Sequence, residues 1–206
     1  MYCKHLLITV ITCWSLSASA QISKGSLFLG GNLFFSTQKN EDAKFTNTAF
    51  SVNPAIGKAI KENLILGIDL TYLNQQTKSN DSTRSTEQYA GAGFFARKYA
   101  FIGKGFYLFG QARVGGYYYE ANNDNENAND GKGFSVGISA YPGISYEVNK
   151  KLHLEAGLAN LFYLNYTNAK YSQPNGDTYT NSAFGIGTAL STGTALSVGL
   201  RFIIAP

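Results

Sequence analysis

Residues 64–72 read Leu-Ile-Leu-Gly-Ile-Asp-Leu-Thr-Tyr, and this stretch decides the fold. Every second residue from Leu64 to Tyr72 is large and apolar, whereas three of the four residues between them, Gly67, Asp69 and Thr71, are small or polar. Successive side chains of a β-strand point to opposite sides, so a period of two places these two sets on opposite faces. The stretch therefore predicts a strand with one apolar face and one small or polar face.

The same alternation recurs along the chain. It is clearest in four more segments, whose apolar faces are Leu27, Leu29, Leu33 and Phe35; Phe134, Val136 and Ile138; Leu152, Leu154 and Leu158; and Leu196, Val198, Leu200 and Phe202. It is weaker over 50–56, 90–96 and 106–120. Ser191-Thr192-Gly193 could form a turn, but Phe184, Ile186 and Leu190 keep the parity of Leu196 and Val198. We therefore expect one long strand over 184–202.

Two kinds of connection separate these segments, and they alternate strictly. Short turns are expected at 61–63, 103–105 and 149–151, and long polar loops at roughly 38–46, 75–87, 121–132 and 167–182. Seven connections predict eight antiparallel strands, with turns on one rim of a barrel and loops on the other. An even number of strands leaves both chain ends on the turn side.

The composition of the two faces indicates which of them is outside. Charged residues make up only 15% of the chain, and the small, polar face lacks the Lys and Glu density of a solvated surface. We therefore expect the apolar face to meet lipid and the other face to line a lumen. A closed barrel leaves no unpaired strand edge in hydrocarbon. The expected fold is all-β, a closed antiparallel up-and-down transmembrane β-barrel of about eight strands; a soluble secreted barrel with its faces reversed is the alternative.

Residues 1–20 have the features of a cleaved export signal. Lys4 and His5 are basic, residues 6–16 are apolar, and Ala18-Ser19-Ala20 is a small-residue cleavage site. We expect residues 21–206 to form the barrel domain. Both cysteines, Cys3 and Cys13, lie in the signal, so the exported chain is expected to have neither a disulfide nor a thiolate metal site.

Charge and motifs exclude several classes of function. Once Lys4 is removed with the signal, 16 of the 17 basic residues and all 13 acidic residues remain, so the net charge is small. Since no run of basic residues occurs either, we expect no nucleic-acid partner. The Asn-rich stretch 122–131 lacks the spacing of a calcium loop, and we expect no metal and no cofactor. His153, the one histidine after residue 20, is expected at the turn rim. A His-based catalytic triad at the outer rim is therefore not expected, and we predict no catalytic residues.

The narrow lumen of an eight-stranded barrel is expected to hold five charged side chains: Asp69, Arg97, Arg113, Glu155 and Arg201. Counted from the short turns, Asp69 and Arg97 lie at similar heights on neighbouring strands, and so do Glu155 and Arg201. Isolated charges in such a lumen are costly, whereas paired charges are tolerated. We therefore expect ion pairs between these residues that plug the lumen; a gated ion path is the alternative.

These patterns resemble the small outer-membrane β-barrel superfamily typified by the OmpA transmembrane domain and OmpX, especially the barrel-only "porin family" proteins of Bacteroidetes type. The resemblance covers residues 21–206 and rests on the signal, the opening strand 24–35, the alternating connections and the closing strand 195–202. It implies an integral protein of the bacterial outer membrane, surrounded by lipid and lipopolysaccharide. It also implies insertion by the barrel-assembly machinery, which usually reads a terminal aromatic residue. Here Phe202 is followed by four more residues.

Three functional hypotheses follow. The first is a structural or surface-interaction role, in which long extracellular loops meet an extracellular ligand or surface. The second is a binder or conduit for a small apolar solute, suggested by the inward parity of Phe28, Phe34, Tyr107 and Phe109. The third is an outer-membrane lipid-modifying enzyme, disfavoured because a base at the outer rim is missing. We favour the first hypothesis. The fold alone does not determine which of the three functions the protein has.

Overall fold

The computed structural model describes residues 21–40, 44–79, 83–124, 129–158, 161–173, 176–188 and 196–206. The expected export signal at 1–20 lies outside the described residues. No helix within the described part is long and apolar enough to cross a membrane. The described chain forms ten β-strands: β1 (Leu27–Asn40), β2 (Phe45–Lys61), β3 (Leu64–Ser79), β4 (Thr83–Gly103), β5 (Phe106–Asn123), β6 (Asp130–Asn149), β7 (Leu152–Leu158), β8 (Phe162–Ser172), β9 (Thr178–Thr188) and β10 (Leu196–Ile204).

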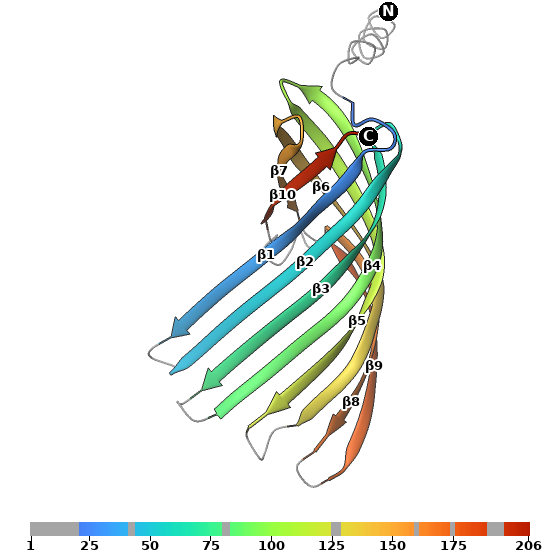
Figure 1. Cartoon of the computed structure of the whole chain (residues 1–206). Helices are drawn as coiled ribbons and strands as arrows, with labels where there is room; N and C mark the ends of the chain where they lie inside the picture. Colours follow the sequence, from blue (N-terminus) through green and yellow to red (C-terminus); the bar gives the residue numbers. More distant parts are fainter. Residues whose placement is uncertain are drawn as a thin grey trace, which may run out of the picture.

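These ten segments make an eight-stranded antiparallel barrel, because two of the barrel strands are each divided into two segments (Figure 1). One half of β6 pairs with β7 and the other half with β8, so β7 and β8 succeed each other at one position of the barrel. In the same way β10 pairs with β7, and β9 pairs with β8. The β5–β6 and β1–β10 pairings close the ring. The all-β barrel expected from the alternation is confirmed.

The three short turns lie where the sequence placed them. They are Glu62-Asn63, Lys104-Gly105 and Lys150-Lys151. Asn63 and Lys104 adopt positive φ angles of 59° and 52°. We call this rim the turn end and the opposite rim the loop end. The first residues of β1 and the C-terminus also lie at the turn end (Figure 1).

The expected long loops are wrong in extent, because most of their residues continue the strands. β3 runs to Ser79 and β4 starts at Thr83, so nearly all of 75–87 is strand. The connections shrink to 41–44, 80–82, 124–129 and 173–177. Beyond the lipid both faces of a strand meet water, so the apolar alternation stops although the hydrogen-bond ladder continues. Strand length therefore exceeds what hydrophobic periodicity reveals.

The single strand expected over 184–202 is described in two parts, β9 up to Thr188 and β10 from Leu196. β9 pairs with β8 and β10 pairs with β7 at one position of the barrel, in agreement with the expected count of eight strands. The Ser191-Thr192-Gly193 stretch lies outside the described residues.

The orientation of the two faces agrees with the sequence. Leu70 and Phe94 are 56% and 69% exposed on the outer wall, whereas the inward Ile65 and Phe95 are buried. Exposed apolar side chains on every barrel strand make a wall suited to lipid. On β3 the outward positions turn polar from Asn74 onward, and on β5 from Glu120 onward.

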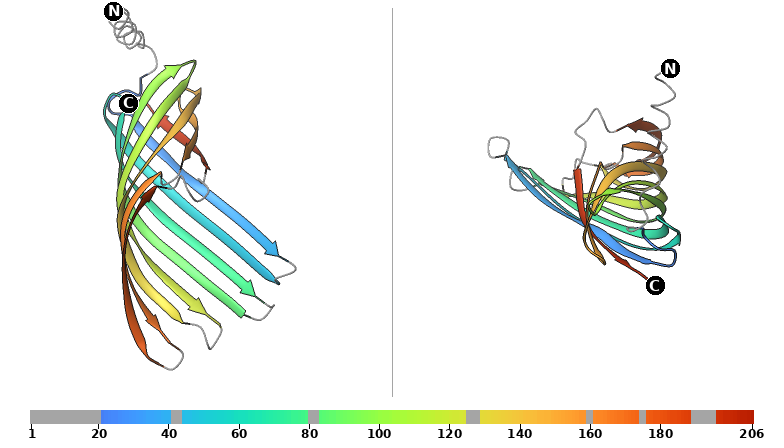
Figure 2. Two further views of the ribbon diagram at one scale, coloured as in Figure 1. Left: turned by 180° about the vertical axis from the view of Figure 1, so that it is seen from behind. Right: turned by 90° about the horizontal axis from the view of Figure 1, so that it is seen from above.

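The barrel is fully paired near the turn end and wider near the loop end. The β1–β10 ladder runs only from Leu27–Ile204 to Gly31–Leu200. Beyond Gly31, the ladder partner of β1 among the described residues is β2 alone, and that of β9 is β8 alone (Figure 2). Phe34, expected inside the lumen, is therefore 53% exposed. Among the described residues β1 is paired on one side only at this height, with β2, so the described chain does not enclose Phe34.

Candidate functional site

The inward parity of the strands brings all five predicted charged residues into the lumen. Asp69 comes from β3, Arg97 from β4, Arg113 from β5, Glu155 from β7 and Arg201 from β10. Four of these residues are buried, and the side chain of Arg113 is 17% exposed. They form two clusters at different heights.

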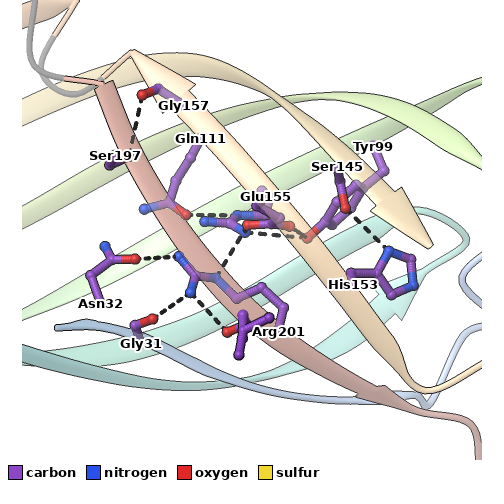
Figure 3. A network of polar contacts seen from close by, with 12 residues as sticks. Gly31, Asn32, Tyr99, Gln111, Ser145, His153, Glu155, Gly157, Ser197 and Arg201 are labelled. Atoms are coloured by element: carbon purple, nitrogen blue, oxygen red, sulfur yellow. Dashed lines mark hydrogen bonds and ion pairs between the residues drawn. The ribbon is translucent and has the colours of Figure 1, made fainter. Parts of the chain in front are cut away.

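Glu155 is the centre of the first cluster. Its carboxylate lies 2.5 Å from Arg97 Nη1 and 3.2 Å from Arg201 Nε. The Tyr99 hydroxyl donates a hydrogen bond to Glu155 Oε1 at 2.6 Å, and Arg97 Nε donates to Gln111 Oε1 at 2.8 Å (Figure 3). The expected pairing of Glu155 with Arg201 is therefore found. Arg97 joins them as a second cation on one carboxylate.

Arg201 lies at the point where β1 and β10 part. Its Nη1 donates to the carbonyl oxygens of Gly31 and Leu200, and its Nη2 donates to Asn32 Oδ1 at 2.8 Å (Figure 3). Backbone carbonyls at the end of a ladder need donors, because a buried unpaired carbonyl is costly. Arg201 supplies those donors while its Nε faces Glu155.

Asp69 and Arg113 form the second cluster, which corrects the expected pairing of Asp69 with Arg97. Arg113 Nε lies 2.9 and 2.8 Å from the two Asp69 oxygens, and its Nη2 lies 2.7 Å from Oδ1. Asp69 is in register with Gly93 of β4, whereas Arg97 is in register with Ile65. Counting heights from separate turns ignores the stagger between tilted strands of a barrel.

Gly93 explains how Arg113 on β5 reaches Asp69 on β3 across the intervening strand. A Cβ atom at Gly93 would lie 2.6 Å from the guanidinium atoms of Arg113. The guanidinium therefore occupies the space that a side chain at Gly93 would need. A glycine on an inward position between two opposite charges is a sequence signal for this kind of contact.

An aromatic layer fills the lumen on the turn-end side of the Glu155 cluster. Phe28, Phe95, Tyr99, Tyr107 and Phe109 are all buried and belong to one apolar cluster. The guanidinium carbon of Arg97 lies 4.5 Å from the ring centre of Phe109 and 5.1 Å from that of Phe28. Cation–π contacts of this kind stabilise a desolvated cation in addition to its ion pair.

The chain before β1 packs against the turn end of this layer. Ile22 is buried in the same apolar cluster. Its backbone N–H donates to Asn63 Oδ1 at 2.9 Å, and the Asn63 N–H donates to the Ile22 carbonyl at 3.0 Å. The positive φ of Asn63 suits an asparagine, which tolerates this conformation better than most residues.

Three cavities of very different size follow the lumen axis. The cavity toward the loop end has a volume of about 550 Å³ and includes Asn53, Ser139 and Asn165 in its lining. A cavity of only about 20 Å³ remains beside Arg97 and Arg201. The turn-end cavity, of about 250 Å³, is lined by residues that include Ile22, Tyr107 and His153. We call the loop-end cavity the outer vestibule and the turn-end cavity the inner vestibule, and no described residue lines both of them.

His153 faces inward near the turn end, as its parity predicts. Its Nδ1 lies 3.1 Å from Ser145 Oγ, and both residues are buried. Ser145 has no exposed surface, so its hydroxyl is not open to a substrate in this conformation. Among the described residues, no group of three or more His, Cys, Asp or Glu side chains could hold a metal ion.

Sequence reasoning missed Tyr99, Gln111, Tyr141 and Ser145 as members of these networks. Arg97 Nη2 donates to the Tyr141 hydroxyl at 3.2 Å, and Tyr107 donates to Glu147 Oε2 at 3.1 Å. Tyr99 and Gln111 share the inward parity of Arg97 and Arg113 on their own strands, and Tyr141 and Ser145 share that of Ser135 and Ser139 on β6. Strand parity could therefore have identified these residues, but only charged residues were considered as candidates.

Comparison with known proteins identifies related barrels. Residues 6–202 match the model of the family described as "Outer membrane protein beta-barrel domain". No curated protein sequence matches the chain. The outer membrane protein OprG from Pseudomonas aeruginosa has a similar structure, with a TM-score of 0.50 and 10% identity over 89% of this chain and 98% of OprG. Neisserial surface protein A (NspA) gives a TM-score of 0.46 and 18% identity, covering 87% of this chain and 99% of NspA.

Proposed function

Since the chain belongs to the outer membrane protein β-barrel family, we propose that it is an integral outer-membrane protein with a sealed lumen, which acts as a structural or surface-interaction protein. The family places it in the bacterial outer membrane. Short turns of such barrels face the periplasm, so the loop end faces the cell exterior. We retain the expectation that residues 1–20 direct export.

One observation supports the proposal that the lumen is sealed. The cavity beside the Arg97–Glu155–Arg201 cluster measures about 20 Å³, and its lining shares no described residue with the turn-end cavity. That volume holds about one water molecule. A single trapped water does not make a continuous hydrated path for an ion, and its neighbours are already engaged in ion pairs. The packed layer favours a plug over a gated path.

Strand length supports a role outside the cell. A transmembrane strand needs only about 9–11 residues to cross the hydrocarbon. β4 has 21 residues and β6 has 20, so about half of each extends beyond the lipid. These extensions are hydrogen-bonded to their neighbours up to the connections. They offer a rigid extracellular surface, where the sequence had suggested long loops.

The proposed partners follow from the outer wall. Its exposed apolar side chains suit acyl chains. Lys132 and Lys170 are directly opposite each other and exposed, and Glu120 of β5 lies opposite Lys132 on its other side. Glu120 offsets part of the repulsion between the two lysines, and the phosphates of lipopolysaccharide would offset the rest. Insertion by the barrel-assembly machinery remains part of the proposal.

The positions of the inward aromatic residues no longer favour the hypothesis of a conduit for an apolar solute. Phe28, Tyr107 and Phe109 are packed as filling of the lumen, and Phe34 is exposed on β1. The enzyme hypothesis gains no support from His153, because its neighbour Ser145 is completely buried.

Single-channel recording in planar bilayers tests the sealed lumen. We expect no conductance steps from the wild-type protein. The Arg97→Ala/Glu155→Ala double variant should conduct, because it removes both halves of the central pair. Retention of a faster-migrating unboiled band on a denaturing gel would show that the variant is folded, and Tyr99→Ala is the substitute if it is not. Reproducible steps from the wild type would overturn the proposal.

A further inference from the structure

The loop-end cavity has the size of a ligand site. Its volume of about 550 Å³ falls within the range of about 300–1,000 Å³ that is usual for small-molecule pockets. Side chains from β1, β2, β3, β5, β6, β8 and β10 line it. The ladder joins β2 to β3, β5 to β6 and β6 to β8, whereas β1 and β10 are no longer paired with each other at this height. Its floor includes Gln111 and Tyr141, which contact Arg97.

Several polar groups in the lining have unused hydrogen-bonding capacity within the described part of the chain. Gln111 accepts through Oε1 from Arg97, which leaves its amide nitrogen uncommitted. The hydroxyls of Ser139, Tyr117 and Tyr163 and the side-chain amide of Asn165 form no side-chain hydrogen bond among the described residues. An apolar ligand would bury these groups unpaired, at about 1–3 kcal/mol each.

The charges in the cavity wall cancel. Asp69 and Arg113 are bound to each other through three contacts of 2.7–2.9 Å. A charged ligand would enter without a counter-charge, which is costly in a confined site. Arg113 uses Nε and Nη2 for Asp69, so Nη1 can still donate to a neutral acceptor.

Aromatic rings complete the lining. Tyr117, Tyr141 and Tyr163 each combine a flat apolar ring with a hydroxyl. The C–H faces of a sugar ring pack against such surfaces, while its hydroxyls both donate and accept hydrogen bonds. Amides, hydroxyls and aromatic rings with no net charge are complementary to a neutral, hydroxyl-rich ligand.

We propose that the loop-end cavity binds a neutral saccharide of about disaccharide size. The inference rests on the proposed function in one respect: the sealed layer makes the extracellular opening the route by which the ligand enters and leaves. The site would bind either a free sugar or the neutral end of a surface glycan.

Calorimetric titration of the folded protein in an amine-oxide detergent, which carries no sugar headgroup, tests the site. The probes are maltose, lactose and sucrose, with N-phenylnaphthylamine as an apolar probe. We expect saturable binding of at least one disaccharide. Asn165→Ala should weaken it about tenfold, because the ligand hydroxyl that the amide binds is left without its partner. Asn74→Ala, on β3 outside the cavity lining, is the matched control and should leave binding unchanged.

Three results would overturn the site: binding of none of the disaccharides, binding of the apolar probe alone, or sugar binding that Asn165→Ala leaves unchanged. Ser139→Ala replaces Asn165→Ala if that variant does not fold. Liposome swelling in the same sugar distinguishes a failure of the saccharide site from a failure of the sealed lumen. Swelling would contradict the sealed lumen, whereas absent binding without swelling would contradict the saccharide site alone.

Discussion

Single inward glycines determine which charged residues meet in the lumen. Gly93 gives the Arg113 guanidinium a passage to Asp69, and Gly30 leaves room for Arg201, whose Cδ would lie 2.3 Å from an added Cβ. The sequence predicted which charges face inward, because strand parity decides that directly. It did not predict that Asp69 would choose Arg113 over Arg97, since partner choice depends on barrel stagger and on the space at Gly93.

Gly93→Ala tests this account of partner choice. The added methyl group displaces the Arg113 guanidinium, which loses its double contact with Asp69. We expect a loss of about 1–3 kcal/mol in the free energy of unfolding, measured by urea titration in detergent. Gly110→Ala is the control, because nothing lies within 4 Å of a Cβ there. Equal stability of the two variants would show that Gly93 does not matter for the pair.

Glu155→Gln tests the central cluster. The substitution keeps the shape of the side chain but leaves Arg97 and Arg201 without their shared carboxylate. Removing one partner of a buried ion pair typically costs about 3–5 kcal/mol. The exposed Glu120→Gln on β5 should change stability by less than about 0.5 kcal/mol. The cluster would have no structural weight if both variants unfolded at the same urea concentration.

At the scale of the strands, periodicity predicted those parts of each strand that touch lipid and failed beyond them. Asn74–Ser79 of β3 and Thr83–Gln88 of β4 are almost wholly polar, yet they form a regular ladder. Backbone hydrogen bonding continues there without any apolar face to reveal it.

A pair of cysteines tests how the barrel closes. Leu29 of β1 lies directly opposite Phe202 of β10, and directly opposite Cβ atoms are about 4.5–5.5 Å apart. Residues 21–206 contain no cysteine, so a Leu29→Cys/Phe202→Cys variant has one candidate bond. Mild oxidation should join the two positions and shift the mobility of the denatured chain on a gel.

The register provides the control for that experiment. Leu29→Cys/Leu200→Cys places the thiols two residues apart along the ladder, because Leu200 pairs with Gly31. We expect much slower cross-linking for this pair. Faster reaction of the offset pair than of the direct pair would mean that β1 and β10 close in another register.

At the scale of the whole molecule, the proposal is that a packed layer separates the outer vestibule from the inner one. The outer vestibule of about 550 Å³ is polar, and the inner one of about 250 Å³ is covered in part by Ile22. Arg97, Glu155, Arg201 and the aromatic layer are buried in the lumen, whereas Asp69 and Arg113 line the outer vestibule. The sequence predicted the membrane barrel and the charges. Inward parity placed Phe28, Tyr107 and Phe109 of the aromatic layer. It could not show how these rings pack or how large the vestibules are, because both arise from the packing of strands distant in sequence.

Thiol accessibility from the cell exterior tests the central claim most directly. Ser139→Cys places a thiol in the outer vestibule, and Ser23→Cys places one in the inner vestibule, both in a chain without other cysteines over residues 21–206. Each variant is exposed to a small, charged methanethiosulfonate in intact cells of a porin-deficient host. A sealed lumen predicts rapid labelling of Ser139→Cys, and labelling of Ser23→Cys only after the outer membrane is permeabilised. Rapid labelling of Ser23→Cys in intact cells would contradict the sealed barrel.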